Sequence, residues 1–171
     1  MWWKAYIPNF LDVIIKGFVY KGLVNPNRIF VTGYSAGGDG IYHLGPMIAD
    51  WLAGAAMMAG HPNGVELYNV RNTTFSIQMG GKDEAYNRND VARQYIGKME
   101  QLHGRYGGYV TKYCNMFEDC EHWMQFNDAG IFPSFLREIR NPYPDCIVFK
   151  QHARMRKQYF YYIEVDPDQH K

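Results

Sequence analysis

Apolar residues recur at three- and four-residue spacing near the start of the chain, which predicts a helix over residues 9–22 with one apolar face. Asn9 can cap the start of this helix, and Gly22 can end it. The residues that form the apolar face are Leu11, Ile14, Ile15, Phe18 and Val19.

Short runs of β-branched, aromatic or small apolar residues alternate with helical stretches in the middle of the chain. These runs predict strands at residues 28–32, 54–58, 75–79 and 109–116. One helical stretch follows residue 37, where Gly45-Pro46 would kink it or open a new helix, and another covers residues 90–104. Because parallel neighbours need long crossovers, this alternation predicts an α/β fold, with a mostly parallel sheet flanked by helices.

The pattern changes after residue 140, where two prolines interrupt it. Two β-rich segments follow, residues 146–151 and 159–165, and a basic linker joins them. They predict an appended antiparallel hairpin. We therefore expect residues 1–140 to form the main domain and residues 141–171 to form the hairpin and a tail.

Composition and charge narrow the classes of partner. Of the 171 residues, 47% are hydrophobic and 20% are charged, which is typical of a globular, core-forming protein. The formal net charge of +1 provides no overall field that would attract nucleic acid or an anionic membrane. The basic and aromatic residues at 154–162 could contact nucleic acid, but they are more typical of a hairpin with a charged tip. We expect no nucleic-acid partner.

Signals of location are few. The longest strongly apolar run, residues 53–59, is much shorter than the ~20 residues of a membrane-spanning helix, so we expect no membrane span. Residues 1–6 lack the apolar segment and cleavage site of a secretory signal. Three cysteines, Cys114, Cys120 and Cys146, are too few for a disulfide scaffold. The expected compartment is the cytoplasm, or an organelle such as the mitochondrion if a leader is missing.

One motif in the chain carries the residue types of nucleophilic catalysis. The sequence Gly33-Tyr34-Ser35-Ala36-Gly37 matches the pattern G-x-S-x-G, follows a predicted strand and opens a predicted helix. A strand that turns at once into a helix strains its corner residue and needs small flanking residues. Ser35 is therefore a candidate nucleophile, and the N–H of Ala36 can stabilise developing negative charge as part of an oxyanion hole. An ordinary turn serine is the alternative.

A catalytic serine needs a histidine base that a carboxylate orients. On this class of fold the partners follow in the order serine, acid, histidine, each on a loop after a later strand. Asp83 follows the strand at 75–79, and His122 follows the strand at 109–116. Both are therefore expected at the carboxyl edge of the sheet. Glu84 is the alternative acid, and the acidic residues around His122 either face its ring or form a solvated surface.

Other kinds of site are less consistent with the sequence. The spacing of Cys114, Cys120 and His122 matches no usual zinc site, so we expect no metal. The glycine-rich residues 35–40 lack the Gly-Lys-Ser/Thr of a phosphate loop and the spacing of a dinucleotide site. We therefore expect no cofactor.

Three segments together resemble the α/β-hydrolase superfamily, and within it the esterases and peptidases similar to polyhydroxybutyrate depolymerases and dienelactone hydrolases. The segments are residues 25–40 (NPNRIFVTGYSAGGDG), 56–63 (AMMAGHPN) and 80–89 (GGKDEAYNRN). The resemblance implies that Ser35 is the nucleophile, Asp83 the acid and His122 the base. It implies hydrolysis of a small-molecule or peptide ester or amide through an acyl-enzyme. Residues near these motifs are candidates for substrate binding: Tyr34, Asp39, His61 and Trp123.

The front of the chain departs from this family pattern. Similar hydrolases have several strands before the nucleophile strand, and one of their loops supplies a second oxyanion-hole N–H. One helix and a turn account for the residues before Arg28. We therefore expect the carboxyl-terminal half of a hydrolase-like fold, with an apolar edge along residues 28–32 that a protein partner covers. A split or truncated hydrolase, an incomplete sequence and a non-catalytic structural subunit of a larger assembly are the alternatives.

Overall fold

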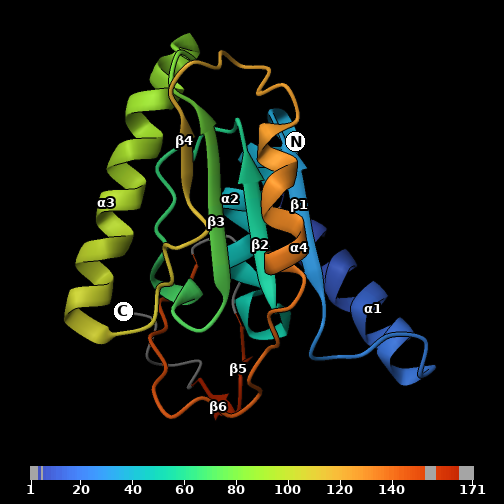
Figure 1. Ribbon diagram of the computed structural model, residues 1–171. Coiled ribbons are helices and arrows are strands. Elements are labelled where there is room, and N and C mark those ends of the chain that lie inside the picture. The colour runs from blue at the N-terminus through green and yellow to red at the C-terminus, as the bar shows by residue number, and fades with distance from the viewer. Residues whose placement is uncertain (1–3, 5, 153–156, 166–171) are drawn as a thin grey trace.

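The computed structural model describes residue 4 and residues 6–152 and 157–165. Its centre is a parallel sheet in the order β1-β2-β3-β4 (Figure 1). The strands are β1 (Phe30–Tyr34), β2 (Gly54–Met58), β3 (Thr74–Gly80) and β4 (Asn115–Phe117). All four strands point in one direction, so their carboxyl ends meet at one edge of the sheet.

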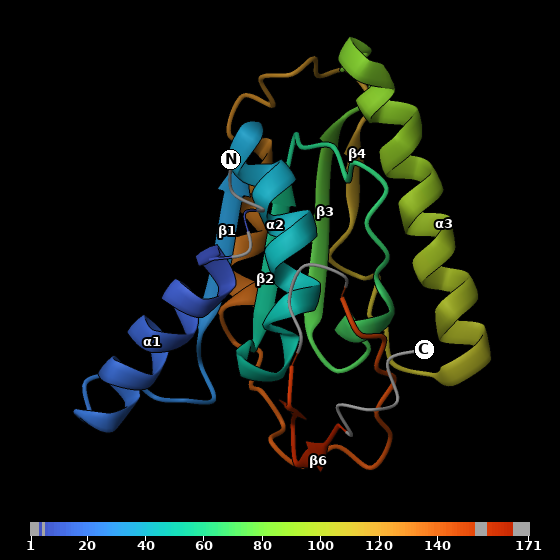
Figure 2. The same cartoon turned by 180° about the vertical axis from the view of Figure 1, so that it is seen from behind.

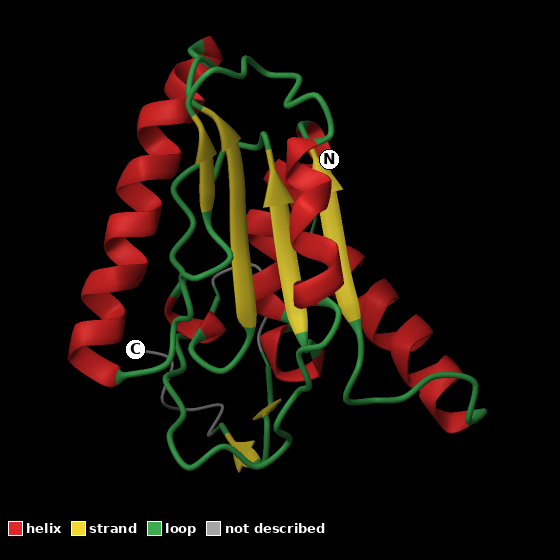
Figure 3. Cartoon of the chain, in the orientation of Figure 1, coloured by secondary structure: helices red, strands yellow, loops and turns green. Residues whose placement is uncertain are grey.

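Helices cover both faces of the sheet. Figures 1 and 2 show α2 on one face and α4 on the opposite face, and Figure 3 separates the helical and strand layers by colour. The α-helices are α1 (Tyr6–Tyr20), α2 (Ala36–Met47), α3 (Arg88–Tyr106) and α4 (Phe132–Phe135). Short 3₁₀ turns lie at η1 (Ala49–Trp51), η2 (Tyr68–Val70), η3 (Ala85–Asn87) and η4 (Asn127–Ile131). The predicted α/β fold is confirmed.

Each face of the sheet has its own core, because side chains alternate along a strand. The larger core joins α1, α2 and α3 to the sheet, and its residues from β2 and β3 are Ala55, Met57, Phe75, Ile77 and Met79. The smaller core packs Ala56 and Met58 of β2 against Phe135 of α4. Every residue of β2 and β3 is buried, which explains why the sequence predicts these strands so closely.

The predicted first helix is present as α1, but it begins at Tyr6, so Asn9 lies inside the helix and does not cap its start. Three of its stripe residues, Leu11, Ile15 and Val19, pack against the larger core. Phe18 belongs to the same predicted stripe but is exposed. In α2 the helix continues through Pro46 and ends one residue later.

The fourth strand is shorter than the predicted 109–116. Tyr109 has a left-handed backbone (φ 48°), which an extended strand does not accommodate. The carbonyl of Tyr113 accepts hydrogen bonds from Ser76 Oγ (2.8 Å) and from Gln78 Nε2. Because these buried side chains of β3 occupy that carbonyl, strand pairing begins only at Asn115.

An antiparallel hairpin lies near the carboxyl end, but the predicted pairing of residues 146–151 with residues 159–165 is wrong. Both strands come from the second segment, β5 (Tyr159–Phe160) and β6 (Ile163–Glu164). The turn between them is Tyr161-Tyr162, with Tyr161 at φ 54°. This turn has none of the Gly, Asn or Asp residues that usually mark a two-residue hairpin, so the sequence contains no signal for it. The linker residues 153–156, with Arg154 and Arg156, lie outside the described residues.

The hairpin region packs against the helices of the sheet. Phe160 is 1% exposed and belongs to the larger core. The ammonium of Lys157 pairs with Asp50 of η1, the turn that follows α2, and both side chains are almost fully buried. No helix in the described part of the chain has the length and apolar character needed to cross a membrane.

Candidate active site

Ser35 lies at the sharp turn between β1 and α2. Its backbone is in a strained positive-φ conformation (φ 54°, ψ −118°), which is rare outside glycine. A Cβ on Gly33 would overlap the carbonyl group of Gly37, and a Cβ on Gly38 would lie 2.5 Å from the carbonyl oxygen of Met58. The glycines therefore let β1, α2 and β2 approach closely enough to hold the serine at the carboxyl edge of the sheet.

Asp83 follows β3 on a loop that contacts the histidine loop directly. The backbone N–H of Lys82 donates to the carbonyl of Cys120 at 2.9 Å. A Cβ on Gly80 would overlap the carbonyl of Glu121, so only glycine allows the two loops to come this close. The Asp83 side chain is 1% exposed.

The structure brings the three predicted catalytic residues together. His122 Nδ1 lies 2.6 Å from Asp83 Oδ2, and His122 Nε2 lies 2.9 Å from Ser35 Oγ. An ionised carboxylate can only accept, so Nδ1 carries the ring proton and Nε2 accepts a hydrogen bond from the Ser35 hydroxyl. Glu84, the alternative acid, is exposed. This arrangement can make the serine oxygen nucleophilic without a metal.

Arg88 is a further residue of the site, at the start of α3, that the sequence analysis did not single out. Its Nη1 donates to Asp83 Oδ1 at 3.3 Å, so both oxygens of the buried carboxylate have a partner. The guanidinium also stacks on the ring of Tyr86, 5.0 Å from its centroid. Nothing in the sequence distinguishes Arg88 from an ordinary residue in the first turn of a helix.

A pocket of about 520 Å³ opens beside Ser35. Its lining comes from three segments and consists of Ser35, Ala36, Asp39, His61, Asn63, Tyr86, Asn87 and Arg88. Asp39 Oδ1 accepts a hydrogen bond from the His61 backbone N–H at 2.7 Å, which joins two of the predicted substrate residues. Ala36 is the first residue of α2, where backbone N–H groups have no partner within the helix.

The other two predicted substrate residues lie outside this lining. Trp123 is 54% exposed on the histidine loop, and its ring meets that of Phe126 edge to face at 4.9 Å. Tyr34 turns toward the histidine loop, and its hydroxyl donates to the backbone carbonyl of His122 at 2.6 Å. Burial raises the pKa of the Tyr34 phenol above its ordinary value, so the hydroxyl remains a donor at neutral pH.

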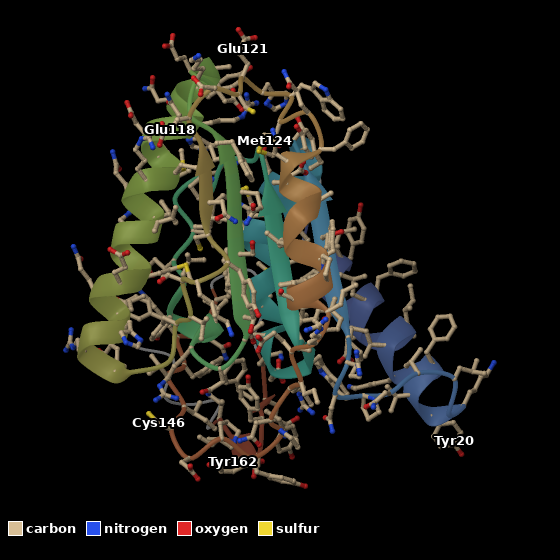
Figure 4. All side chains as sticks on the ribbon, in the orientation of Figure 1. Tyr20, Glu118, Glu121, Met124, Cys146 and Tyr162 are labelled. Carbon is tan, nitrogen blue, oxygen red and sulfur yellow. The ribbon has the colours of Figure 1, made fainter. Side chains whose placement is uncertain are left out.

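The acidic residues around His122 form a solvated surface. Glu118 makes a two-point ion pair with Arg93 (2.6 and 2.9 Å), and Asp119 pairs with Lys82 at 3.2 Å. Figure 4 shows Glu121 at the outer margin of this edge. Glu118 and Asp119 therefore contact cations of neighbouring segments.

No group of three or more potential ligand side chains that could hold a metal is found in the described part of the chain. Cys120 belongs to the smaller core, and Cys114 lies 3.8 Å from the carbonyl oxygen of Phe75. His122 is hydrogen-bonded to Asp83 and Ser35. The candidate metal ligands Cys114, Cys120 and His122 therefore do not form one cluster.

Comparison with known proteins identifies the class of fold. No protein-family model and no curated protein matches the sequence. Among solved structures, the chain is similar to one described as a thermostable esterase, with a TM-score of 0.60 and 15% sequence identity. The alignment covers 76% of this chain and 36% of that esterase, so the chain spans about a third of the length of the protein it resembles. The chain thus has an esterase-like α/β fold.

Proposed function

We propose that this chain carries the catalytic centre of a serine hydrolase that cleaves a carboxylic ester or amide. The observation that carries the proposal is the continuous hydrogen-bonded relay from Asp83 through His122 to Ser35, built from three separate loops. The strained backbone of Ser35 supports it, because strain of this kind gathers at functional sites. The esterase-like fold supports it as an analogy, and the branch near polyhydroxybutyrate depolymerases and dienelactone hydrolases is part of the same proposal.

Each step of the proposed reaction uses a residue of this site. His122 Nε2 takes the proton of the Ser35 hydroxyl as Oγ attacks the carbonyl carbon, and Asp83 stabilises the imidazolium that forms. The N–H of Ala36 donates to the oxyanion of the tetrahedral intermediate. The imidazolium then protonates the leaving alcohol or amine, which leaves an acyl group on Oγ. Water attacks this ester by the same route and restores the free serine.

The pocket beside Ser35 is the proposed substrate site. Its polar lining from Asp39, His61 and Arg88 suits a small-molecule or peptide substrate with hydrogen-bonding groups. Trp123 and Phe126 would form an exposed aromatic rim on the histidine loop.

A protein segment that covers the outer edge of β1 belongs to the same proposal. In the described part of the chain β1 pairs only with β2, so its other edge is open. A strand laid against this edge would bury it and bring a further loop to the carboxyl edge beside Ser35, where a second oxyanion-hole N–H is needed.

Hydrolysis of a short-chain p-nitrophenyl ester tests the proposed activity. Ser35→Ala removes the attacking oxygen, and we expect at least a thousand-fold loss of kcat/KM, with a circular dichroism spectrum like that of the wild type. Ser134→Ala, at a serine in α4, is the matched control and should keep full activity. Equal turnover by the Ser35→Ala variant would remove Ser35 as the nucleophile.

The open edge of β1 also favours a second candidate function, a non-catalytic structural subunit of a larger assembly. In that case the wild type and Ser35→Ala would both be inactive, alone and in the native extract. The Ser35–His122–Asp83 geometry would then be inherited structure.

A further inference from the structure

Tyr34 connects the nucleophile strand to the loop that carries His122. It is the last residue of β1 and immediately precedes Ser35, yet its hydroxyl reaches backbone 88 residues further along the chain. The hydroxyl donates to the His122 carbonyl at 2.6 Å and accepts from the Met124 N–H at 3.3 Å. Figure 4 labels Met124 on the segment that crosses the carboxyl edge of the sheet. One side chain thus holds the backbone on both sides of residue 123.

The histidine loop has few other backbone restraints at this point. Among the described residues, the backbone of residues 121–123 makes no hydrogen bond except the one from Tyr34 to His122. Gln125 and Phe126 follow with positive φ values of 55° and 64°, which are costly for residues other than glycine. A loop with strained backbone and few hydrogen bonds needs another contact to keep one conformation.

The side chain of His122 is itself 41% exposed, so packing alone does not hold it. The ring of Tyr34 lies edge-on to the His122 ring, with centroids 5.9 Å apart, and its hydroxyl fixes the attached backbone. Because Tyr34 and Ser35 are adjacent in the chain, these contacts link the base and the nucleophile by a short path.

We propose that Tyr34 is a positioning residue that sets the distance between His122 Nε2 and Ser35 Oγ. The inference rests on the proposed hydrolase function and gives a role to the residue that immediately precedes the serine. Tyr34 acts only through His122, because its hydroxyl is occupied by the loop backbone and it does not line the pocket beside Ser35.

Tyr34→Phe tests this role because it removes the hydroxyl and keeps the ring. With a short-chain ester we expect kcat to fall about ten-fold while KM stays within two-fold, since proton transfer depends on the position of the imidazole. The matched control is Tyr95→Phe, which removes a tyrosine hydroxyl that also donates to a backbone carbonyl, that of Val65, at 2.6 Å. If the Tyr34 hydroxyl had only a structural role, its removal would lower stability, as in Tyr95→Phe, and kcat would be unchanged in both variants. A Tyr34→Phe kcat within two-fold of the wild type overturns the proposal.

A second readout separates this inference from the proposed function. In protein with ¹⁵N-labelled histidine, the Nδ1 proton that bonds to Asp83 should give a protected resonance, assigned by its loss in His122→Gln. We expect this resonance to broaden by solvent exchange in Tyr34→Phe and to persist in Tyr95→Phe. If the wild type hydrolyses no ester, either alone or in the native extract, the proposed function fails, while this difference between the variants still supports the positioning role. An unchanged resonance in Tyr34→Phe contradicts that role whether or not the protein is active.

Discussion

At the scale of single residues, the site depends on a buried carboxylate and on hydroxyls that each have a hydrogen-bond partner. Asp83 has both oxygens occupied, one by His122 and one by Arg88, and its side chain is almost fully buried. An ionised carboxylate in this position is stable only while cations or donors compensate its charge.

Arg88→Met should therefore lower the free energy of unfolding by about 3 kcal/mol, because it leaves the buried Asp83 carboxylate with one partner fewer. Arg88→Lys keeps the positive charge and should recover part of the loss. Urea denaturation monitored by tryptophan fluorescence measures both. A change below about 0.5 kcal/mol in Arg88→Met, the range of an ordinary surface substitution, would show that Arg88 does not stabilise Asp83.

The thiols of Cys114 and Cys146 should differ in reactivity at neutral to alkaline pH. Burial raises the pKa of the Cys114 thiol to about 11, whereas Cys146 is exposed. At pH 8 only about one Cys114 in a thousand is a thiolate, and the thiolate is the reactive form. Brief treatment with iodoacetamide followed by mass spectrometry should show Cys146 modified first, with the Cys114 rate rising as the pH approaches 11. Equal modification of both at pH 8 would contradict the raised pKa of the Cys114 thiol.

The residue scale also shows what sequence reasoning misses. The motifs predict Ser35, Asp83 and His122 because loop order is visible in the chain, and the structure places the three within hydrogen-bonding distance. The bonds of Tyr34 to the histidine loop and of Arg88 to Asp83 depend on side-chain direction after folding. No spacing rule predicts them.

At the scale of elements, the turn from β1 into α2 determines where the serine lies. The G-x-S-x-G pattern suggests that both flanking glycines are needed, but the structure distinguishes them. A Cβ at Gly33 would overlap backbone atoms of Gly37, whereas a Cβ at Gly37 would meet nothing within 4 Å.

Gly33→Ala should lower the free energy of unfolding by about 2 kcal/mol or more, because a backbone clash forces the turn to shift. Gly37→Ala should be neutral or slightly stabilising, since alanine favours the helix and has space. Thermal denaturation of the two variants, side by side with the wild type, gives the comparison. Equal destabilisation of both would contradict the observed packing of the turn.

The sequence predicts a strand correctly where an apolar run in the chain is also buried in the fold. The run 54–58 is apolar and buried on both faces, and it is a strand with the predicted bounds. The run 109–116 and the hairpin differ because their limits are set elsewhere, by buried Ser76 and Gln78 on β3 and by a turn of two tyrosines. Tertiary contacts, and not local propensity, determine where these two elements begin and end.

At the scale of the whole molecule, an apolar region extends from α1 to the open edge of β1. Phe10, Val13 and Tyr20 of α1 are more than half exposed, while Ile15 on the opposite side is buried. Beside them an apolar groove of about 230 Å³ lies between α1, β1 and α2, lined by Leu11, Val31, Thr32, Gly37, Gly40, Ile41 and Leu44. A helix with apolar side chains on its exposed side as well as its buried side usually lies within a larger structure.

This region should make the isolated chain self-associate as its concentration rises. Phe10→Lys combined with Val13→Lys should weaken the association without a large change in stability, because both side chains are exposed. Ile15→Lys is the contrasting variant and should unfold the region, because Ile15 is buried in the larger core. Sedimentation velocity over a concentration series gives the result. A chain that stays monomeric at high concentration would argue against self-association through the exposed apolar residues of α1.

Labelling with a fluorophosphonate probe tests whether Ser35 is the activated nucleophile that we propose. The probe reacts with a serine only when its base is assembled, so it requires no knowledge of the substrate. We expect mass spectrometry to find the probe on Ser35, in the purified chain or in the native extract where the proposed partner would cover β1, and we expect His122→Gln to abolish the labelling. Absence of label on Ser35 in both preparations would rule out this role of Ser35.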